Sequence, residues 1–171
     1  IDAAATGAMN GLQMVGAIGA MLLAFIALIA MVNGMLEAGG AWVGIEQLTL
    51  ERVLGGLLQP LAWALGIPWD EAQLAGSLIG QKFILNEFVA YVTFSEVAAQ
   101  LSPHSQAIVI FALCGFANLS SIAILLGGLG AVAPGRRDDI SRYGFRALIA
   151  ASLSNLLSAA LAGFFLTLGA A

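Results

Sequence analysis

Five polar residues in two short segments of this sequence could together bind a solute. The segment GQKFILNEFVAY holds Lys82, Asn86 and Glu87, and the segment CGFANLSS holds Asn118 and Ser121. A carboxylate, two amides and a hydroxyl offer both acceptors and donors of hydrogen bonds. Neither segment contains an arginine that could grip a phosphate or carboxylate ligand. This chemistry suits a neutral solute with adjacent hydroxyl groups, such as a sugar.

The rest of the chain has the composition of a helical membrane protein. Of its 171 residues, 60% are hydrophobic and 9% are charged, whereas a soluble domain carries about a quarter charged residues. The stretches 3–36, 97–135 and 147–171 contain no Asp, Glu, Lys or Arg, and each exceeds the roughly 20 residues of a spanning helix. We therefore expect an all-α integral membrane protein. Its six basic residues provide no basic face for nucleic acid.

Two elements are expected in the first third of the chain. The apolar run Leu12–Leu36 predicts a first membrane-spanning helix, which the pair Gly39–Gly40 should end. Leu48–Leu65 has charges near its start and tryptophans near its boundary, a pattern typical of a helix that lies in the membrane interface. Pro60 would kink or break that helix.

The remaining residues predict one hairpin and two spans. Residues 68–101 read as two helical arms of roughly 13 residues, each about 20 Å long, which is too short for a hydrocarbon core of about 30 Å. We therefore expect a re-entrant hairpin. Residues 103–132 should form a spanning helix that is interrupted at Cys114–Ser121, and residues 139–168 the last span. The arginines between Arg136 and Arg146 place that loop in the cytoplasm by the positive-inside rule.

The hairpin tip can keep its charges at membrane depth. Asn86 is expected to be the N-cap of the second arm, which puts Glu87 in the first turn, where free N–H groups and the helix dipole favour a carboxylate. Lys82, in the last turn of the first arm, suits the opposite end of its own dipole. Ionisable groups within membrane segments are functional by default. The alternative is that Lys82 and Glu87 only neutralise each other and pin the hairpin shut.

The interrupted span supplies the second half of the predicted site. Asn118 and Ser121 are three residues apart and share one helical face. The alternative is that they only form hydrogen bonds between neighbouring helices, as Ser and Asn do in many helical bundles. Phe116 could provide a flat apolar wall, or else face lipid or pack in the core. Two broken helices with their N-termini in mid-membrane are typical of a secondary-transporter site. We expect no catalytic residue and no metal site, since no suitable base or ligand set is present.

The two polar segments resemble one known family. GQKFILNEFVAY and ALCGFANLSSIAILLGGLG, followed by PGRRDD, are similar to the second hairpin and the next broken helix of the concentrative nucleoside transporters, and the similarity extends over essentially the whole chain. The resemblance implies an inverted-repeat fold with a scaffold domain and a mobile transport domain. Residues 1–47 would be a scaffold helix and linker, 48–67 an external interfacial helix, and 68–171 half of the transport domain.

The same resemblance implies what the chain does. Glu87, Asn118 and Ser121 match residues that contact the ribose, Phe116 matches an aromatic residue lining the pocket, and Lys82 and Asn86 would support the tip. Family members are homotrimers in a lipid bilayer that import nucleosides with Na⁺ or H⁺, here in a bacterial inner membrane. Nothing matches the family's first hairpin, so we expect an excerpt, the C-terminal repeat, with the ion site on the other half and no other cofactor. A passive channel or a structural helical subunit is the alternative.

Overall fold

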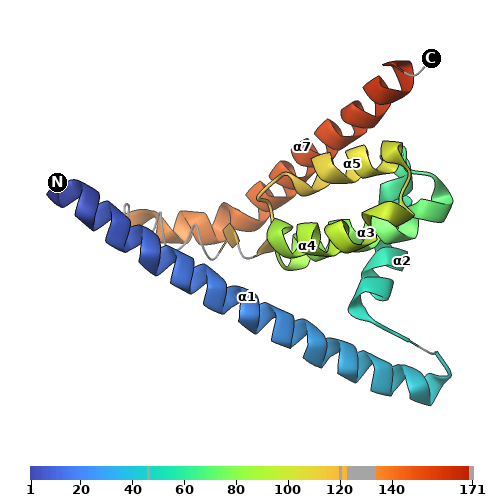
Figure 1. The fold of residues 1–171 in the computed structure, drawn as a ribbon, viewed down its shortest axis with the longest axis horizontal. Helices are drawn as coiled ribbons and strands as arrows, with labels where there is room; N and C mark the ends of the chain where they lie inside the picture. Colours follow the sequence, from blue (N-terminus) through green and yellow to red (C-terminus); the bar gives the residue numbers. More distant parts are fainter. Residues whose placement is uncertain (46, 120, 123–133, 170–171) are drawn as a thin grey trace. The chain divides into compact units, whose positions relative to one another are not determined.

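The computed structural model describes residues 1–45, 47–119, 121–122 and 134–169. Within these ranges the chain is helical and contains no strand. It divides into two compact units, residues 1–50 and 51–171, which are described separately. The helices (Figure 1) are α1 (Asp2–Val43), α2 (Leu50–Ala64), α3 (Trp69–Ile84), α4 (Glu87–Val97), α5 (Pro103–Leu113) and α7 (Arg137–Gly169), with short 3₁₀ turns at Ala98–Gln100 and Pro134–Arg136.

The first helix, α1, is longer than the sequence predicts. It continues through the pair Gly39–Gly40, so the prediction that this pair ends it is wrong. The helix ends at Gly44, whose φ of 76° is in the left-handed region and whose N–H donates to the carbonyl of Gly40, a common way to stop a helix. A Cβ on Gly40 would lie 2.6 Å from the carbonyl oxygen of Ile45 and 2.9 Å from Cβ of Leu48. Gly40 therefore lets the following chain fold back onto α1.

Glycines allow α2 and α3 to pack with their backbones almost in contact. A Cβ on Gly55 of α2 would lie 2.7 Å from the carbonyl oxygen of Gln73, and one on Gly76 of α3 would lie 2.9 Å from backbone atoms of α2. Gly80 follows Gly76 at the spacing of a GxxxG motif, which is typical of close helix contacts. Pro60 lies inside α2 and does not end it, so of the two expected effects, a kink or a break, the break is not found.

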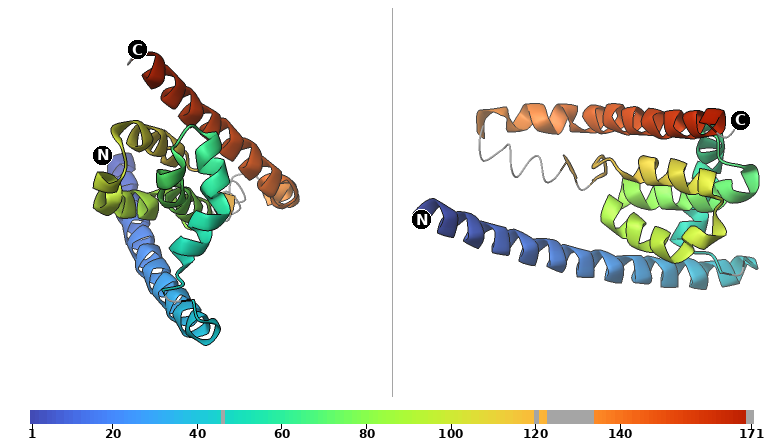
Figure 2. Two further views of the ribbon diagram at one scale, coloured as in Figure 1. Left: turned by 90° about the vertical axis from the view of Figure 1, so that its right-hand side faces the viewer. Right: turned by 45° about the horizontal axis from the view of Figure 1, so that its top comes forward.

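The core of the second unit lies among α3, α4, α5, α7 and the end of α2. Figure 2 shows α5 between the α3–α4 pair and α7, in agreement with the helix contacts. Small residues are frequent on the buried face of α3, so these helices approach closely. The buried apolar residues are Ala62, Leu65, Ile67, Ala72, Ala75, Leu78, Ile79, Ala90, Leu101, Ile108, Val109, Ala112, Leu113, Leu156 and Ala159.

The predicted spans are only partly covered by the described residues. In that part, one helix, Ser141–Gly169, is long and apolar enough to cross a membrane, and Pro103–Leu113 is a shorter apolar helix. The predicted span 103–132 lies partly outside the described residues, as do many side chains of Leu12–Leu36.

A carboxylate of α3 holds the start of α5. Ser102 is the N-cap of α5 and accepts a hydrogen bond from the N–H of Ser105 at 3.3 Å. Both carboxylate oxygens of Glu71 accept from the Ser102 N–H at 3.1 Å, and one accepts from its hydroxyl at 3.0 Å. Burial raises the pKa of Glu71, but the hydrogen bonds from Ser105 and Ser102 outweigh it and leave this pKa below its usual value. The charged form is therefore the one that stabilises the fold.

The α2–α3 contact predicts opposite effects for two glycine substitutions. Gly76→Ala should lower stability by about 1–3 kcal/mol, because the new methyl group would meet backbone atoms that cannot move aside. Gly56→Ala is the matched control, because a Cβ on Gly56 would have no atom within 4 Å and alanine favours a helix by about 0.5–1 kcal/mol. Thermal unfolding of the purified protein in detergent would measure both, and an unchanged midpoint for Gly76→Ala would contradict the close contact.

The Glu71 cap predicts a pH-dependent contribution to stability. Glu71→Gln should cost about 0.5–1 kcal/mol at neutral pH, as expected for a weakened helix cap. The folded-state pKa of Glu71 lies below the usual value of 4.5. The Glu71 carboxylate should therefore contribute fully to the stability of the wild type above pH 4.5, and this contribution should be lost as the pH falls through the folded-state pKa. The thermal midpoints of the wild type and of Glu71→Gln, measured at a series of pH values, should become equal as the pH falls below 4.5. Asp70→Asn, in the same turn but without these hydrogen bonds, should show no such convergence.

Candidate functional site

The first part of the candidate site is the junction between α3 and α4, which pack side by side (Figure 1). Helix α3 ends at Ile84 and α4 begins at Glu87. Asn86 has extended backbone geometry, with φ −167°, and its side-chain oxygen accepts from the N–H of Val89 at 2.9 Å. Asn86 is therefore the N-cap of α4, as the sequence predicts, and Glu87 stands in the first turn near the free N–H groups.

The second part is the interruption after α5. The helix ends at Leu113, residues 114–118 are not helical, and helix resumes at Leu119. The side-chain oxygen of Asn118 accepts from the N–H of Ser121 at 2.9 Å, and the Ser121 hydroxyl accepts from the N–H of Asn118 at 3.4 Å. This reciprocal pair is the geometry of a capping box. The chain is thus non-helical within the predicted stretch Cys114–Ser121, whereas residues 123–133 lie outside the described part of the chain.

One hydrogen bond joins the two parts of the site. The amide nitrogen Nδ2 of Asn118 donates to Oε2 of Glu87 at 3.0 Å. Asn118 is buried, with 3% of its surface exposed, whereas Glu87 is half-buried. For this carboxylate, no other hydrogen bond is recorded in the described ranges, so Glu87 keeps most of its capacity to accept hydrogen bonds.

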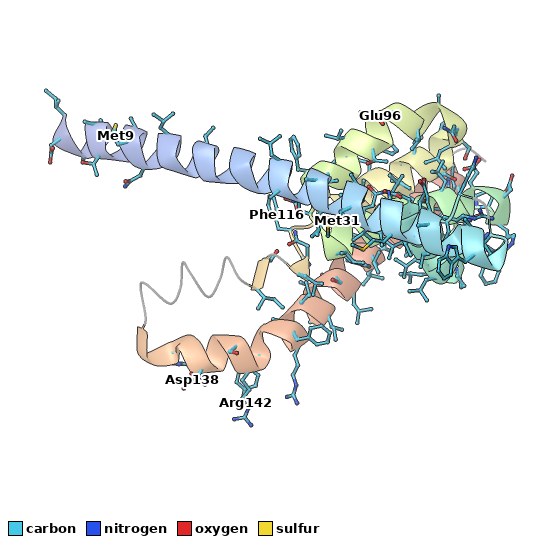
Figure 3. The ribbon with its side chains drawn as sticks, turned by 90° about the horizontal axis from the view of Figure 1, so that it is seen from below. Met9, Met31, Glu96, Phe116, Asp138 and Arg142 are labelled. Atoms are coloured by element: carbon cyan, nitrogen blue, oxygen red, sulfur yellow. The ribbon has the colours of Figure 1, made fainter. Side chains whose placement is uncertain are left out.

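Phe116 and Cys114 lie in the non-helical segment between α5 and the next helix start. The carbonyl of Phe116 accepts hydrogen bonds from the Asn118 amide, at 3.2 Å, and from the Ser121 hydroxyl. Its side chain is 77% exposed, and Figure 3 shows it in the segment between α5 and α7. The ring is therefore free for an apolar contact and does not pack in the core of this chain. Cys114 is also exposed.

Lys82 does not pair with Glu87. Its side chain is fully buried, and its ammonium Nζ donates to Oδ1 of Asn155 on α7 at 3.0 Å. Within the described residues, no ion pair between Lys82 and Glu87 is recorded. Lys82 and Glu87 therefore form no direct ion pair, although their charges attract each other, and the hydrogen bond of Lys82 ties α3 to α7.

Asn155 is a residue of this network that the sequence analysis missed. Its Nδ2 donates to the carbonyl of Phe111, in the last turn of α5, at 2.8 Å. A Cβ on Gly115 would lie 2.7 Å from Oδ1 of Asn155, so the glycine makes room for this side chain. Its position could have drawn attention to it, because Asn155 is the one asparagine in the uncharged stretch 147–171. An amide in such a stretch must find a hydrogen-bond partner.

Two further side chains that the sequence analysis did not single out fix α4 against its neighbours. The hydroxyl of Thr93 donates to the buried Gln81 of α3 at 2.9 Å. The hydroxyl of Tyr91 donates to the carbonyl of Ile110 in α5 at 2.8 Å. These hydrogen bonds hold the α3–α4 pair together and against α5, so the orientation of Glu87 follows from the packing of three helices.

The site can recognise a polar, uncharged solute. It offers one carboxylate, a buried amide and a hydroxyl beside an exposed aromatic ring. Among the described residues there is no group of three or more His, Cys, Asp or Glu that could hold a metal ion. Carboxylate, amide and hydroxyl groups together can exchange hydrogen bonds with the hydroxyl groups of a solute.

Comparisons with known proteins agree on one family. A family model described as "Na+ dependent nucleoside transporter C-terminus" matches residues 1–163. The chain is 55% identical to "Uncharacterized transporter YutK" of Bacillus subtilis, over 97% of this chain and 41% of that protein. It is 52% identical to "Putative nucleoside permease NupX" of Escherichia coli, over 98% and 41%, and 37% identical to "Sodium/nucleoside cotransporter 1" of rat, over 95% and 28%.

Solved structures show the same fold. The structure described as "CNTnw in an inward-facing substrate-bound state" is 57% identical and matches with a TM-score of 0.94 over 100% of this chain and 42% of that one. A variant of the same protein described as in an outward-facing state matches with a TM-score of 0.93. The chain thus spans about two fifths of the length of the bacterial relatives and of these structures.

Proposed function

The chain belongs to the Na⁺-dependent nucleoside transporter C-terminus family, and from this premise we propose that it forms the C-terminal repeat of a transporter that imports nucleosides with Na⁺ or H⁺. Membership of a transporter family makes it an integral membrane protein. The names of the Escherichia coli and rat relatives support the substrate class, and the rat name supports sodium coupling. The proposed location is a bacterial plasma membrane, with the segment Arg136–Arg146, which includes the start of α7, in the cytoplasm.

The observation that carries the proposal is the hydrogen bond between Asn118 and Glu87. It joins the start of α4 to the helix start after α5 and puts a carboxylate and an amide in direct contact. Adjacent ribose hydroxyls can donate to Glu87. Asn118 and Ser121, whose polar groups bond to each other, to Glu87 and to the Phe116 carbonyl, would exchange some of these hydrogen bonds for contacts with the sugar. In this proposal Phe116, whose ring is exposed, lies against the apolar face of the nucleoside.

The proposed mechanism is alternating access. The inward-facing and outward-facing structures of a relative with this fold support two states between which the solute-binding part moves. In the proposal α3 and α4 form a re-entrant hairpin, because each is shorter than a hydrocarbon core of about 30 Å. Residues 68–171 would move as half of a transport domain against a scaffold that includes residues 1–47, in a homotrimer, with residues 48–67 as an interfacial helix. The contacts to the base and the ion would lie on the other repeat.

The role of Glu87 predicts the effect of removing its charge. In the full-length protein, Glu87→Gln should reduce uridine uptake by about ten- to a hundredfold, because a hydrogen bond to a charged acceptor contributes about 1.5–3 kcal/mol. Expression and oligomer size should not change. Glu96→Gln is the matched control, since Glu96 is an exposed carboxylate on the same helix (Figure 3). Uptake that Glu87→Gln leaves unchanged would refute the site assignment.

Active transport is distinguished from a passive channel by accumulation. Proteoliposomes that hold the full-length protein and an inward gradient of Na⁺ or H⁺ should concentrate uridine above the external level. The accumulation should collapse when an ionophore removes the gradient of the coupling ion. Uridine that only equilibrates across the membrane, with any gradient, would instead establish the channel.

A further inference from the structure

We propose that Asn155 is a positioning residue that holds the Lys82 ammonium away from Glu87, so that the carboxylate stays free to accept hydrogen bonds from the solute. This inference rests on the proposed function, because it assigns the reason for which Glu87 is available. It concerns a residue of α7 that is neither part of the two polar segments nor in contact with Glu87.

The geometry gives Lys82 a choice between two acceptors. Lys82 lies in the last turn of α3 and Glu87 begins α4, so only five positions along the chain separate the two charges. The ammonium is fully buried and must therefore find an acceptor inside the protein. Its hydrogen-bond partner is the uncharged oxygen of Asn155 at 3.0 Å, and the ammonium also lies 4.8 Å from the centre of the Phe83 ring. A carboxylate attracts a buried ammonium more strongly than an amide does.

Asn155 can compete with the Glu87 carboxylate for the Lys82 ammonium because its side-chain amide is held in place. Its Nδ2 donates to the Phe111 carbonyl at 2.8 Å, which sets the side-chain rotation so that Oδ1 points to Lys82. Gly115 leaves the necessary space, since a Cβ there would lie 2.7 Å from Oδ1. The amide thus lies ready in the orientation that Lys82 needs, and little conformational freedom is lost when the contact forms.

The consequence concerns the carboxylate. With Lys82 held by α7, Glu87 has one recorded hydrogen bond, from Asn118. If Lys82 turned to Glu87, the ammonium would occupy the oxygens to which the solute hydroxyls would donate. Asn155 would therefore affect the affinity for the solute through Lys82 and not through its own contact with the solute.

A double-mutant cycle in the full-length protein tests this coupling. The Michaelis constant KM for uridine uptake into proteoliposomes would be measured for wild type, Asn155→Leu, Lys82→Met and the double variant. Asn155→Leu should raise KM about tenfold in the wild-type background, the effect of losing a hydrogen bond to a charged acceptor. In the Lys82→Met background the same substitution should change KM by less than about twofold, because residues that act through one another are not additive. Ser154→Leu, on the adjacent exposed position, should leave KM as it is.

The outcomes are separable. The inference would be overturned if Asn155→Leu raised KM by the same factor in the wild-type and Lys82→Met backgrounds. It would also be overturned if Ser154→Leu raised KM as much as Asn155→Leu does. Gly115→Ala repeats the cycle without removing the amide, since the new methyl group would displace Asn155, and it takes the place of Asn155→Leu if that variant does not fold. A wild-type protein that does not accumulate uridine would instead refute the proposed function, whereas accumulation with an additive cycle would refute only the role of Asn155.

Discussion

The structure depends on one constraint, which is that backbone groups left free where a helix is interrupted need side-chain partners. In a membrane these groups cannot turn to water, and each one left unsatisfied would cost several kcal/mol. Asn86 accepts from the first turn of α4, Asn118 accepts from the helix start after α5, and Asn155 donates to the last turn of α5. Three asparagines thus make the two interruptions compatible with an apolar environment.

The same side chains build the candidate site, so fold and binding chemistry cannot be separated here. Asn118 caps a helix through its oxygen and donates to Glu87 through its nitrogen. Asn155 satisfies a carbonyl of α5 through its nitrogen and holds Lys82 through its oxygen. An amide can perform both tasks because it carries an acceptor and a donor at fixed positions. A carboxylate at either position could only accept hydrogen bonds, so it would satisfy only one of the two partners.

The local features of the fold could be predicted from the sequence, because their causes are local. Asn86 before Glu87 is a cap signal, and Asn118 with Ser121 is another, and both caps are found. The end of α1 was misplaced because Gly39–Gly40 resembles a helix end, whereas the geometry that stops the helix belongs to Gly44. The spacing of glycines in the sequence does not show which of them takes the left-handed backbone conformation that ends the helix.

The long-range contacts could not be predicted in the same way. Lys82 and Glu87 are close in sequence and opposite in charge, so pairing was a natural alternative, but the partner of Lys82 is an amide 73 residues away. The contact between Glu87 and Asn118 spans 31 residues and was anticipated only as a shared site. Such contacts depend on how α5 packs between the hairpin helices and α7, which no single segment encodes.

The position of Cys114, an exposed residue, has a practical consequence. Cys114 is the chain's one cysteine and sits in the non-helical segment that carries Phe116 and leads to Asn118. A maleimide dye attached to its sulfur would place a fluorophore at this junction, four residues from the buried amide, without any engineered attachment point in this chain. Its emission would follow the polarity around the interruption as solute arrives, which offers an optical record of occupancy in real time.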